Sequence, residues 1–248
     1  MSEARILFGF HAITGRLRRR PDSVHEIFID AGRRDARARE LIERARGAGV
    51  RVIEADGTRL ERLAGTTKHQ GVAARVADIV LAASVEQILA AASEPALLLV
   101  LDGVQDPHNL GACLRVADAF GAQAVIAPKD RAVGLTPAVA KVASGAAETV
   151  PYVQVTNLAR TLRDLKEAGV WVLGADQAGD ASIAAARLDG ALAWVLGAEG
   201  EGLRRLTREG CDEVYRIPMH GSVDSLNVSV AAGVCLYESR RQRIAVTP

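Results

Sequence analysis

The chain has 248 residues, of which 49% are hydrophobic and 25% charged, and its formal net charge is +1. This length and composition are typical of an ordinary soluble globular protein with one large domain or two modest ones. The longest apolar runs, such as 96–101, are too short to cross a bilayer, and the first residues lack the basic and apolar sections of a secretory signal.

The basic residues are unevenly distributed along the chain. Residues 1–75 carry 16 Lys or Arg against 10 Asp or Glu, whereas residues 76–248 carry 15 against 20. Arginine accounts for 27 of the 31 basic residues, and its guanidinium fork suits phosphate recognition. A high-GC genome gives the same arginine bias. The asymmetry favours nucleic acid as the anionic partner of the amino-terminal part.

Residues 6–76 alternate short strands and helices and predict a small α/β unit. The expected elements are strand 6–8, helix 11–20, strand 26–30, helix 35–46, strand 50–54 and strand 71–76. Pro21 ends the first helix, and Gly47 and Gly49 lie where the second should stop. We expect this domain to span 1–76 and a linker with a short helix over 85–92 to follow at 77–95.

From residue 96 onward the predicted strands are almost continuously apolar. They cover 97–101, 124–127, 170–173 and 192–196, and a further strand is expected at 214–218. The helices predicted between and after them cover 107–120, 136–144, 157–168, 203–209 and 226–239. Unbroken apolar strands alternating with helices indicate a doubly wound parallel sheet over 96–248, and such sheets bind ligands at the carboxyl ends of their strands.

The first of three polar loops follows strand 97–101 and leads into helix 107–120. Asp106 can cap that helix and Pro107 suits its first turn. Leu110, Cys113, Leu114 and Ala117 share one helical stripe and are expected to face the core. The opposite side carries Arg115 among small residues, namely His108, Gly111, Ala112 and Ala119. Another chain or a ligand can approach Arg115 there; the alternative is a solvated helix arginine.

The second loop, Gly197-Ala-Glu-Gly-Glu-Gly202, follows strand 192–196. Its glycines permit positive φ angles and close backbone approach to a ligand. The spacing is not that of a dinucleotide fingerprint, and no phosphate-binding Gly-Lys-Ser/Thr occurs in the chain. Glu199, at the strand end, is a plausible partner for an arginine. The alternative is a simple turn with two exposed glutamates.

The third loop, Ser222 to Asn227, follows strand 214–218. Ser225 can cap a helix beginning at Leu226, but capping does not explain Asn227. That helix is apolar on nearly every side, so the fold or a second subunit must bury it.

The chain shows no pattern of a metal site or a structural disulfide. The five histidines have no ligand spacing, and the cysteines Cys113, Cys211 and Cys235 are odd in number without Cys-x-x-Cys spacing. We therefore expect no metal, and buried thiols in a reducing cytoplasm.

These loops, in this order and spacing, resemble the signature motifs of the SpoU (TrmH-like) RNA ribose 2′-O-methyltransferases of the SPOUT class. The resemblance covers essentially the whole chain. It rests on Asp106-Pro-His-Asn-Leu-Gly-Ala-Cys-Leu-Arg115, Val155-Thr-Asn-Leu-Ala-Arg160, Gly197-Ala-Glu-Gly-Glu-Gly202 with Arg204-Arg-Leu-Thr-Arg-Glu209, and Ser225-Leu-Asn-Val-Ser-Val230.

The resemblance implies a fold that the sequence pattern alone does not suggest. Members thread the carboxyl-terminal helix through a deep trefoil knot, whereas true knots are nearly absent among proteins. They form homodimers beside the knot, which suits the apolar helix 226–239. The amino-terminal part is similar to the ribosomal-protein-L30e-like substrate-binding domain of such enzymes.

The resemblance also implies a cofactor, S-adenosylmethionine, and a reaction, 2′-O-methylation of a guanosine ribose in the peptidyl-transferase region of 23S rRNA. By motif, the catalytic group is Asn109, Arg115, Glu199, Ser225 and Asn227. The cofactor is expected to contact Gly197, Ala198, Gly200, Gly202, Ile217, Pro218, Met219, Ser225 and Leu226. Structured RNA is expected to contact Arg16, Arg18, Arg19, Arg20, Arg33, Arg34 and Lys68, unless these form only a solvated basic face.

Within that group we expect Arg115 to orient the hydroxyl or a neighbouring phosphate and to stabilise alkoxide charge, because a free guanidinium, with a pKa above ~12, is a poor base. Glu199 and Asn109 would hold Arg115, while Ser225 and Asn227 contact the target nucleotide.

Three other functions stay open at this stage. A related enzyme could act on tRNA, or a knotted RNA-binding scaffold could have lost turnover. A nicotinamide-dependent oxidoreductase fits the coarse α/β pattern but lacks the fingerprint.

Overall fold

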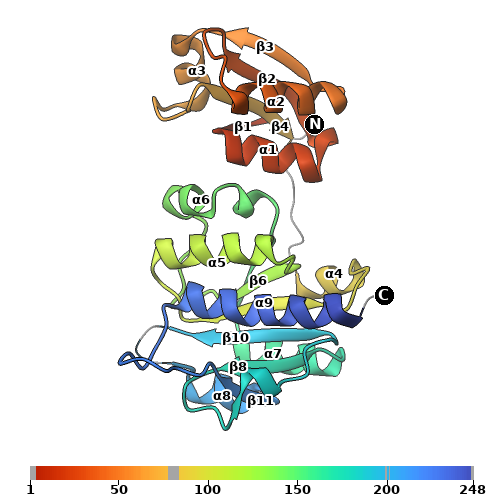
Figure 1. Ribbon diagram of the computed structural model, residues 1–248, viewed down its shortest axis with the longest axis vertical. Helices are drawn as coiled ribbons and strands as arrows, with labels where there is room; N and C mark the ends of the chain where they lie inside the picture. The colour runs from red at the N-terminus through yellow and green to blue at the C-terminus, as the bar shows by residue number, and fades with distance from the viewer. Residues whose placement is uncertain (1–3, 78–83, 199, 201, 247–248) are drawn as a thin grey trace. The chain divides into compact units, whose positions relative to one another are not determined.

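The computed structural model describes residues 4–77, 84–198, 200 and 202–246, without the side chains of residues 4, 19, 245 and 246. The chain divides into two compact units. The first contains the described residues up to 77 together with Ser144–Thr149, and the second contains the rest. Figure 1 labels most of the elements of both.

The first unit is a small four-stranded sheet with helices. Its elements are β1 (Ala4–Phe8), α1 (Phe10–Arg19), η1 (Pro21–Ser23), β2 (Val24–Asp30), α2 (Ala36–Gly47), β3 (Arg51–Ala55), α3 (Gly57–Ala64), β4 (Val72–Ala77) and η2 (Ala146–Glu148). The strand order is β1-β4-β2-β3, with β4 antiparallel to both neighbours and β2 parallel to β3. All the predicted elements up to residue 77 are confirmed. Helix α3, which begins after the cap Asp56, was not predicted.

The second unit is a seven-stranded sheet in which every pair of neighbouring strands is parallel, as the sequence predicts. Its strands are β5 (Leu97–Asp102), β6 (Ala124–Pro128), β7 (Tyr152–Val155), β8 (Trp171–Ala175), β9 (Ala181–Ser182), β10 (Leu192–Gly197) and β11 (Glu213–Arg216). Its helices are α4 (Val85–Ala90), α5 (Pro107–Ala119), α6 (Pro137–Ala143), α7 (Leu158–Glu167), η3 (Ile183–Ala185), α8 (Arg205–Gly210) and α9 (Val228–Val246).

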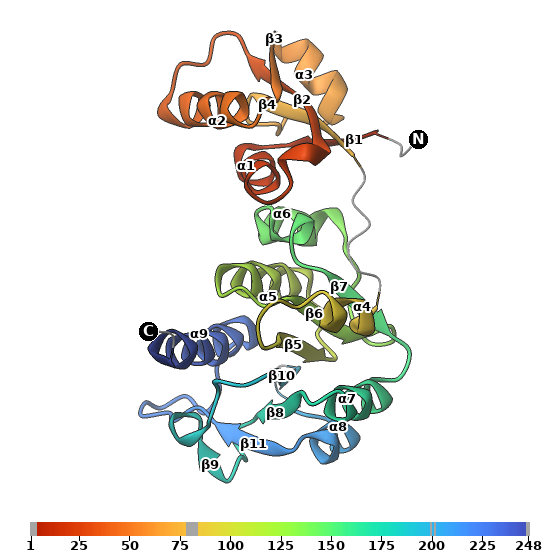
Figure 2. The same ribbon diagram turned by 90° about the vertical axis from the view of Figure 1, so that its right-hand side faces the viewer.

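The helices of this unit cover both faces of its sheet (Figure 2). On one face, α4 and α7 pack against alternate strand residues such as Leu98, Val100 and Val195. On the other face lie α5 and α9, where the indole N–H of Trp194 donates to Ser239 Oγ at 2.8 Å. Strand residues point alternately to opposite faces, so two covered faces require the unbroken apolar strands seen in the sequence.

The strand order β7-β6-β5-β10-β8-β11-β9 contains a topological switch. The chain lays down β5, β6 and β7 in one direction, then crosses back, so that β10 lies between β5 and β8. Loops on either side of such a switch diverge and leave a crevice at the carboxyl ends of the strands. The loops after β5 and β10 are therefore the ones expected to border a ligand site.

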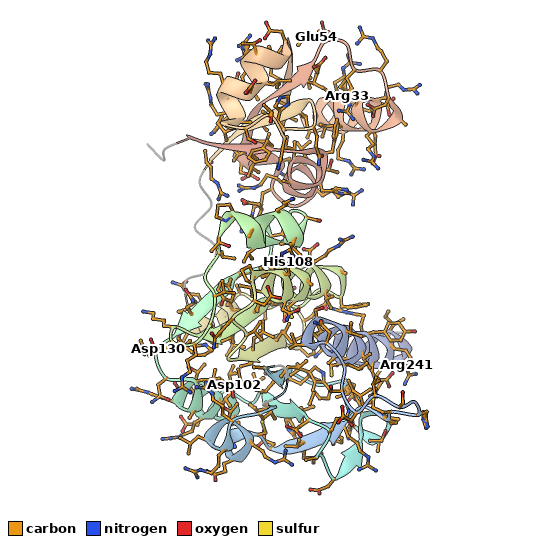
Figure 3. The ribbon with its side chains drawn as sticks, turned by 90° about the vertical axis from the view of Figure 1, so that its left-hand side faces the viewer. Arg33, Glu54, Asp102, His108, Asp130 and Arg241 are labelled. Carbon is orange, nitrogen blue, oxygen red and sulfur yellow. The ribbon has the colours of Figure 1, made fainter. Side chains whose placement is uncertain are left out.

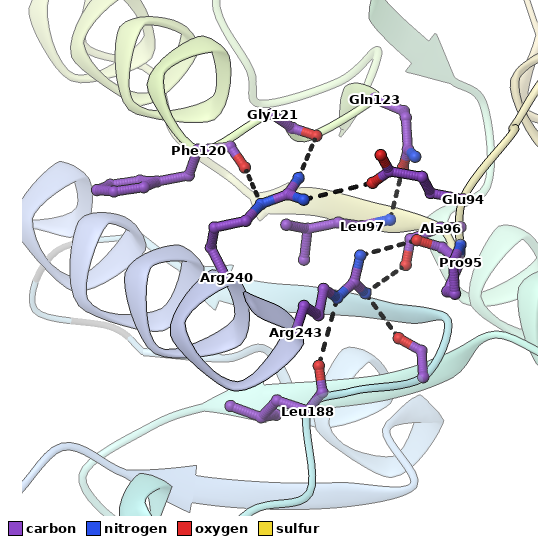
Figure 4. Close-up of polar contacts among 11 residues, drawn as sticks. Glu94, Pro95, Ala96, Leu97, Phe120, Gly121, Gln123, Leu188, Arg240 and Arg243 are labelled. Atoms are coloured by element: carbon purple, nitrogen blue, oxygen red, sulfur yellow. Dashed lines mark hydrogen bonds and ion pairs between the residues drawn. The ribbon is translucent and has the colours of Figure 1, made fainter. Parts of the chain in front are cut away.

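Helix α9 lies antiparallel to the strands, and two arginines fix its far end (Figure 4). Arg240 donates to the carbonyl oxygens of Phe120 and Gly121, which precede β6, and Arg243 to those of Pro95, Ala96, Leu188 and Gly190, which precede β5 and β10. These carbonyls lie at the amino ends of the strands. The first turn of α9 consequently reaches the carboxyl ends.

No helix among the described residues is both long and apolar enough to cross a membrane.

Candidate functional site

Two adjoining cavities occupy the switch point between β5 and β10. The larger has a volume of about 510 Å³ and is bordered by the segments after β8, β10 and β11 and by the start of α9. The smaller has a volume of about 260 Å³ and is bordered by the loop after β5, by Arg131 and by Arg204. Both are lined by Ala198, Gly202 and Val228, so the loop after β10 and the first turn of α9 form the wall between them.

Most residues expected to contact a cofactor line the larger cavity. They are Gly197, Ala198, Gly200, Gly202, Ile217, Ser225 and Leu226. Pro218 and Met219 lie outside this lining. The lining also contains Asp176 and Gln177, which follow β8 and which we did not predict. Like the predicted loops, they are polar residues directly after an apolar strand. This sequence feature could have predicted their place in the site.

The glycines of the second loop are required by a close backbone approach. A Cβ on residue 197 would lie 1.9 Å from the carbonyl oxygen of Gly202, and Gly202 has a φ of +64°. Gly202 N–H also donates to the carbonyl of Ala198 at 3.1 Å, which closes the loop into a tight turn. Any side chain at 197 would force this turn open, so glycine here shapes the cavity wall.

The first and third loops meet through one hydrogen bond. Asn227 Nδ2 donates to Asn109 Oδ1 at 2.9 Å, although the two residues are 118 positions apart in the chain. Asn227 Oδ1 accepts from the backbone N–H of Ser229 at 2.9 Å, so Asn227 also caps α9. The predicted cap at Ser225 and helix start at Leu226 are therefore wrong: the helix begins at Val228, and Ser225 is an exposed residue of the cavity lining.

Arg115 is exposed on α5 and lines neither cavity. It lies six residues beyond Asn109, about 9 Å along the helix axis at 1.5 Å per residue. No hydrogen bond joins it to Asn109, whose acceptor oxygen is engaged by Asn227. Glu199, the other residue expected to hold Arg115, lies outside the described residues.

The core stripe predicted for α5 is confirmed, since Leu110, Cys113, Leu114 and Ala117 are all buried. The opposite face is only partly open. Gly111 is buried against α6, where a Cβ would lie 2.6 Å from Val142 Cβ.

An ion pair that we did not predict joins the loops after β5 and β10. The Asp102 side chain is fully buried, and it accepts from the backbone N–H of Arg204 at 3.2 Å and from Arg204 Nε at 2.7 Å. A buried carboxylate is costly unless it is paired and hydrogen-bonded. Figure 3 shows Asp102 within the body of this unit, in contrast to Arg241 on the outer side of α9. The sequence feature that could have predicted this ion pair is an acidic residue at the end of an apolar strand.

The basic residues expected to contact RNA fall into two groups where the structure describes their side chains. Arg18, Arg20, Arg34 and Lys68 are exposed. The side chain of Arg19 lies outside the described residues. Arg16 is buried, and its guanidinium donates to Ser23 Oγ and to the carbonyl of Ala77. Arg16 therefore acts inside the domain, against our expectation of an RNA contact.

Arg33 is half-buried and is also engaged within its domain. Its guanidinium lies 4.8 Å from the centre of the Phe10 ring and donates to Asp35 and to the carbonyl of Gln70. The hydrogen bond from Arg33 lowers the pKa of Asp35 below its ordinary value. Arg33 stabilises the loop before α2 and is less available to phosphate than the exposed arginines.

The thiols are not placed for nucleophilic chemistry. Burial raises the pKa of Cys113 to about 12 and that of Cys211 to about 12, and it also raises the pKa of Cys235. All three therefore stay protonated at neutral pH. No group of three or more His, Cys, Asp or Glu side chains suited to a metal ion occurs among the described residues.

Comparison with known families gives two matches that together cover most of the chain. A model of the SpoU rRNA methylase family matches residues 96–237, and a model of the RNA 2′-O ribose methyltransferase substrate-binding domain matches residues 6–79.

The chain belongs to the SpoU rRNA methylase family.

SpoU relatives of similar length share more than half of their residues with this chain. The 23S rRNA (guanosine-2′-O-)-methyltransferase RlmB of Ralstonia nicotianae is 58% identical over 99% of both chains. The protein of the same name from Nitrosomonas europaea is 57% identical over 98% of this chain and 93% of its own. The likeness expected from the motifs is confirmed, and within the family it extends to proteins named RlmB.

Solved SpoU structures share the two-part architecture. The SpoU methyltransferase AviRb from Streptomyces viridochromogenes, in complex with the cofactor AdoMet, is 26% identical, with a TM-score of 0.71 over 97% of this chain and 90% of its own. The fold of this chain is accordingly that of a SpoU methyltransferase, a parallel sheet with an amino-terminal substrate-binding domain.

The Asp102–Arg204 pair predicts a measurable coupling between the two loops of this SpoU protein. We expect Asp102→Asn and Arg204→Met each to lower the free energy of unfolding by about 1–3 kcal/mol, because Arg204→Met leaves the buried Asp102 carboxylate without its charged partner and Asp102→Asn removes the charge that pairs with Arg204. Arg204 is 37% exposed, so solvent reduces the coupling between the two changes to about 1 kcal/mol. Both tryptophans lie in the second unit, so tryptophan fluorescence during urea unfolding reports on this unit.

The exposed pair Arg187–Asp189 of the same unit is the control, with Arg187 90% exposed. Its double-mutant cycle is expected to give a coupling near zero. An Asp102–Arg204 coupling no larger than this control would show that the pair does not tie the loops together.

Proposed function

We propose that this chain transfers a methyl group from S-adenosylmethionine to the ribose 2′-hydroxyl of a guanosine in 23S rRNA, in the peptidyl-transferase region. The observation that carries the proposal is the pair of adjoining cavities at the β5–β10 switch point, with Asn109 and Asn227 hydrogen-bonded beside them. RlmB proteins named for this reaction match nearly the whole chain. The rRNA substrate places the enzyme in the cytoplasm.

The larger cavity suits S-adenosylmethionine. Its volume of about 510 Å³ falls in the range of small-molecule sites, and part of its wall is bare backbone, because a Cβ at Gly197 would collide with the carbonyl oxygen of Gly202. Leu196, Ile217 and Leu226 provide apolar surface. Polar contacts come from backbone groups of the lining residues Gly197, Ala198, Gly200, Gly202 and Ile217. When bound, the cofactor supplies an electrophilic methyl carbon on a sulfonium sulfur.

Methyl transfer to a hydroxyl is an in-line displacement, so positioning provides most of the catalysis. Asn109 and Asn227 stand where the larger and smaller cavities adjoin, and their mutual hydrogen bond fixes both amide orientations. Together with Ser225, they hold the target nucleotide so that its 2′-hydroxyl faces the larger cavity. Glu199 belongs to the same group by its place in the second motif.

Arg115 orients the hydroxyl or the neighbouring phosphate and stabilises negative charge that develops on the ribose oxygen. A guanidinium is in general a poor base, so a role as a free base is disfavoured. Because Arg115 lies outside both cavities of its own chain, it reaches the reacting atoms through a second copy of the protein.

A homodimer through α9 supplies that second copy. Val230, Tyr237 and Ile244 are more than half exposed and are spaced by seven residues, which places them along one side of the helix. Such an apolar stripe on α9 and near α5 suits a subunit interface. We also assign the carboxyl-terminal part the deep trefoil knot of the SPOUT class, on the strength of the SpoU family match over residues 96–237.

The reaction is tested by incubating the protein with labelled S-adenosylmethionine and separate transcripts of 23S rRNA and tRNA, followed by mapping of the modified ribose. We expect one 2′-O-methylguanosine in the 23S transcript. Arg115→Ala should lower turnover by at least about 10²-fold because transition-state charge loses its stabilising group, while calorimetry should show unchanged cofactor affinity. Sedimentation of the variant provides the control for its oligomeric state.

Label found only in tRNA would show that the protein catalyses the same reaction on tRNA and not on 23S rRNA. Cofactor binding without label in any RNA would indicate a scaffold without turnover. Near-normal methylation by Arg115→Ala would remove Arg115 from the proposed catalytic group.

We assign RNA recruitment to the amino-terminal domain, as a domain similar to ribosomal protein L30e. The support is the match of residues 6–79 to a substrate-binding family and the excess of basic residues in this part. Exposed arginines and lysine contact phosphate and set the register of the RNA without reading its sequence. Of the predicted contacts, Arg18, Arg20, Arg34 and Lys68 are exposed, and the ion pair of Arg18 with Glu40, at 3.9 Å, is itself open to solvent.

Replacing these four residues by glutamine should weaken RNA binding and flatten its salt dependence. Each lost phosphate contact reduces the slope of log K against log salt by about 0.7–0.9, so the four together should reduce it by roughly 3. The control replaces four exposed arginines of the second unit, Arg160, Arg163, Arg187 and Arg205. Filter binding at salt concentrations between about 50 and 200 mM gives the slope of log K against log salt for each variant. Equal slopes for the two variants would contradict the assignment.

A further inference from the structure

The smaller cavity carries polar side chains that the reaction described above does not use. Besides Asn109, it is lined by Gln105, Asp106, Arg131 and the Asp102–Arg204 pair. Asp102 and Arg204 neutralise each other. Gln105, Asp106 and Arg131 are exposed to the cavity and come from two loops, one after β5 and one after β6.

Arg131 is held in an unusual backbone conformation. Its φ is +59°, in the left-handed region that non-glycine residues rarely adopt and that clusters at functional sites. Hydrogen bonds on both sides maintain it: Lys129 N–H donates to Val155 O at 2.8 Å, and Val133 N–H donates to Val104 O at 3.1 Å. The Tyr152 hydroxyl donates to Val133 O at 2.7 Å. The loop is thereby fixed with Arg131 at the cavity.

The donors and acceptors of this cavity are left available. Within the part of the chain that the structure describes, the Arg131 guanidinium makes no hydrogen bond or ion pair, and neither does the Gln105 amide. Asp106 Oδ1 accepts from the backbone N–H of His108 at 2.9 Å as the cap of α5, and Oδ2 has no donor among the described residues. The cavity thus offers a bidentate donor and a carboxylate acceptor together.

This combination matches guanine better than the other bases. Guanine presents two acceptors, O6 and N7, to which arginine binds in a bidentate manner, and next to them two donors, N1–H and the N2 amino group. Adenine places an amino donor where guanine has O6, which would face the guanidinium. A phosphate would suit Arg131 but not the Asp106 carboxylate in the same cavity.

On the basis of the proposed methyl transfer, we propose that the smaller cavity binds the base of the target guanosine, with Arg131 on O6 and N7 and Asp106 on N1–H and the N2 amino group. The base must be unpaired in this arrangement, because Watson–Crick pairing would occupy N1–H and the N2 amino group. The shared wall of Ala198, Gly202 and Val228 then places its ribose beside the larger cavity. Arg131 and Asp106 are specificity-determining residues in this arrangement.

The test compares RNA substrates that differ only at the target position, which carries guanosine, inosine or adenosine. We expect wild-type kcat/KM to fall in that order, because inosine lacks the N2 amino group and adenosine also presents the wrong edge to Arg131. Arg131→Gly removes the guanidinium and suits the positive φ, so the fold is retained. It should lower kcat/KM for the guanosine substrate about 10- to 100-fold, mostly through KM, and reduce the discrimination against adenosine.

Asp106→Asn retains a good helix cap, since asparagine and aspartate cap equally well. It should reduce the preference for guanosine over inosine, because the amide is a poorer acceptor for N1–H and N2–H. Arg163→Ala, which removes an exposed arginine of α7 away from both cavities, is the control and should leave both ratios unchanged. Calorimetry with S-adenosylmethionine alone should give wild-type affinity for all three variants.

Two results would overturn this assignment while leaving the methyl transfer intact. One is equal methylation of guanosine and adenosine substrates by the wild-type protein. The other is wild-type discrimination by both Arg131→Gly and Asp106→Asn. Absence of methyl transfer from the wild-type protein to the guanosine substrate would instead count against the proposed function itself.

Discussion

The buried carboxylate of Asp102 is the interaction on which the geometry of the site depends. It ends β5, opposite Gly197 at the end of β10, and its charge can be buried only because Arg204 returns to meet it. To bring Arg204 there, the chain must turn back within a few residues of β10. That turn is possible because residue 197 has no side chain, since a Cβ would overlap the carbonyl of Gly202. One ion pair and one glycine therefore set the wall shared by both cavities.

The sheet topology makes this wall functionally useful. Because β10 lies between β5 and β8, three strands that are distant in sequence end beside one another, and polar residues after each strand border the same space. Helix α9 completes the site. Arg240 and Arg243 hold its far end at the start of the strands, and Asn227 at its near end bonds to Asn109. Because α9 is anchored to the sheet at its far end, it fixes the position of Asn227, a residue of the proposed catalytic group, relative to the sheet.

Much of this arrangement could be predicted from the sequence. The unbroken apolar strands predicted the parallel sheet. The glycine loop and the two asparagines predicted the location of the cavities that they line. The errors have local physical causes. Ser225 and Asn227 are both good caps, and only the course of the backbone selects Asn227. Helix α3 is short, with Leu60 as its one fully buried residue, so its periodicity is weak. Arg16 looks like any other arginine of a basic run, and its burial depends on packing that the run does not reveal.

The central claim, that separate loops after β5, β8, β10 and β11 form one composite site, is tested most directly by hydrogen–deuterium exchange with and without ligands. S-adenosylmethionine should protect peptides covering 175–177, 196–203 and 217–231, and an RNA fragment carrying the target guanosine should add protection at 102–109 and near 131. Protection by the cofactor restricted to other surfaces, such as the cavity around Asp180 and Tyr215, would contradict the account.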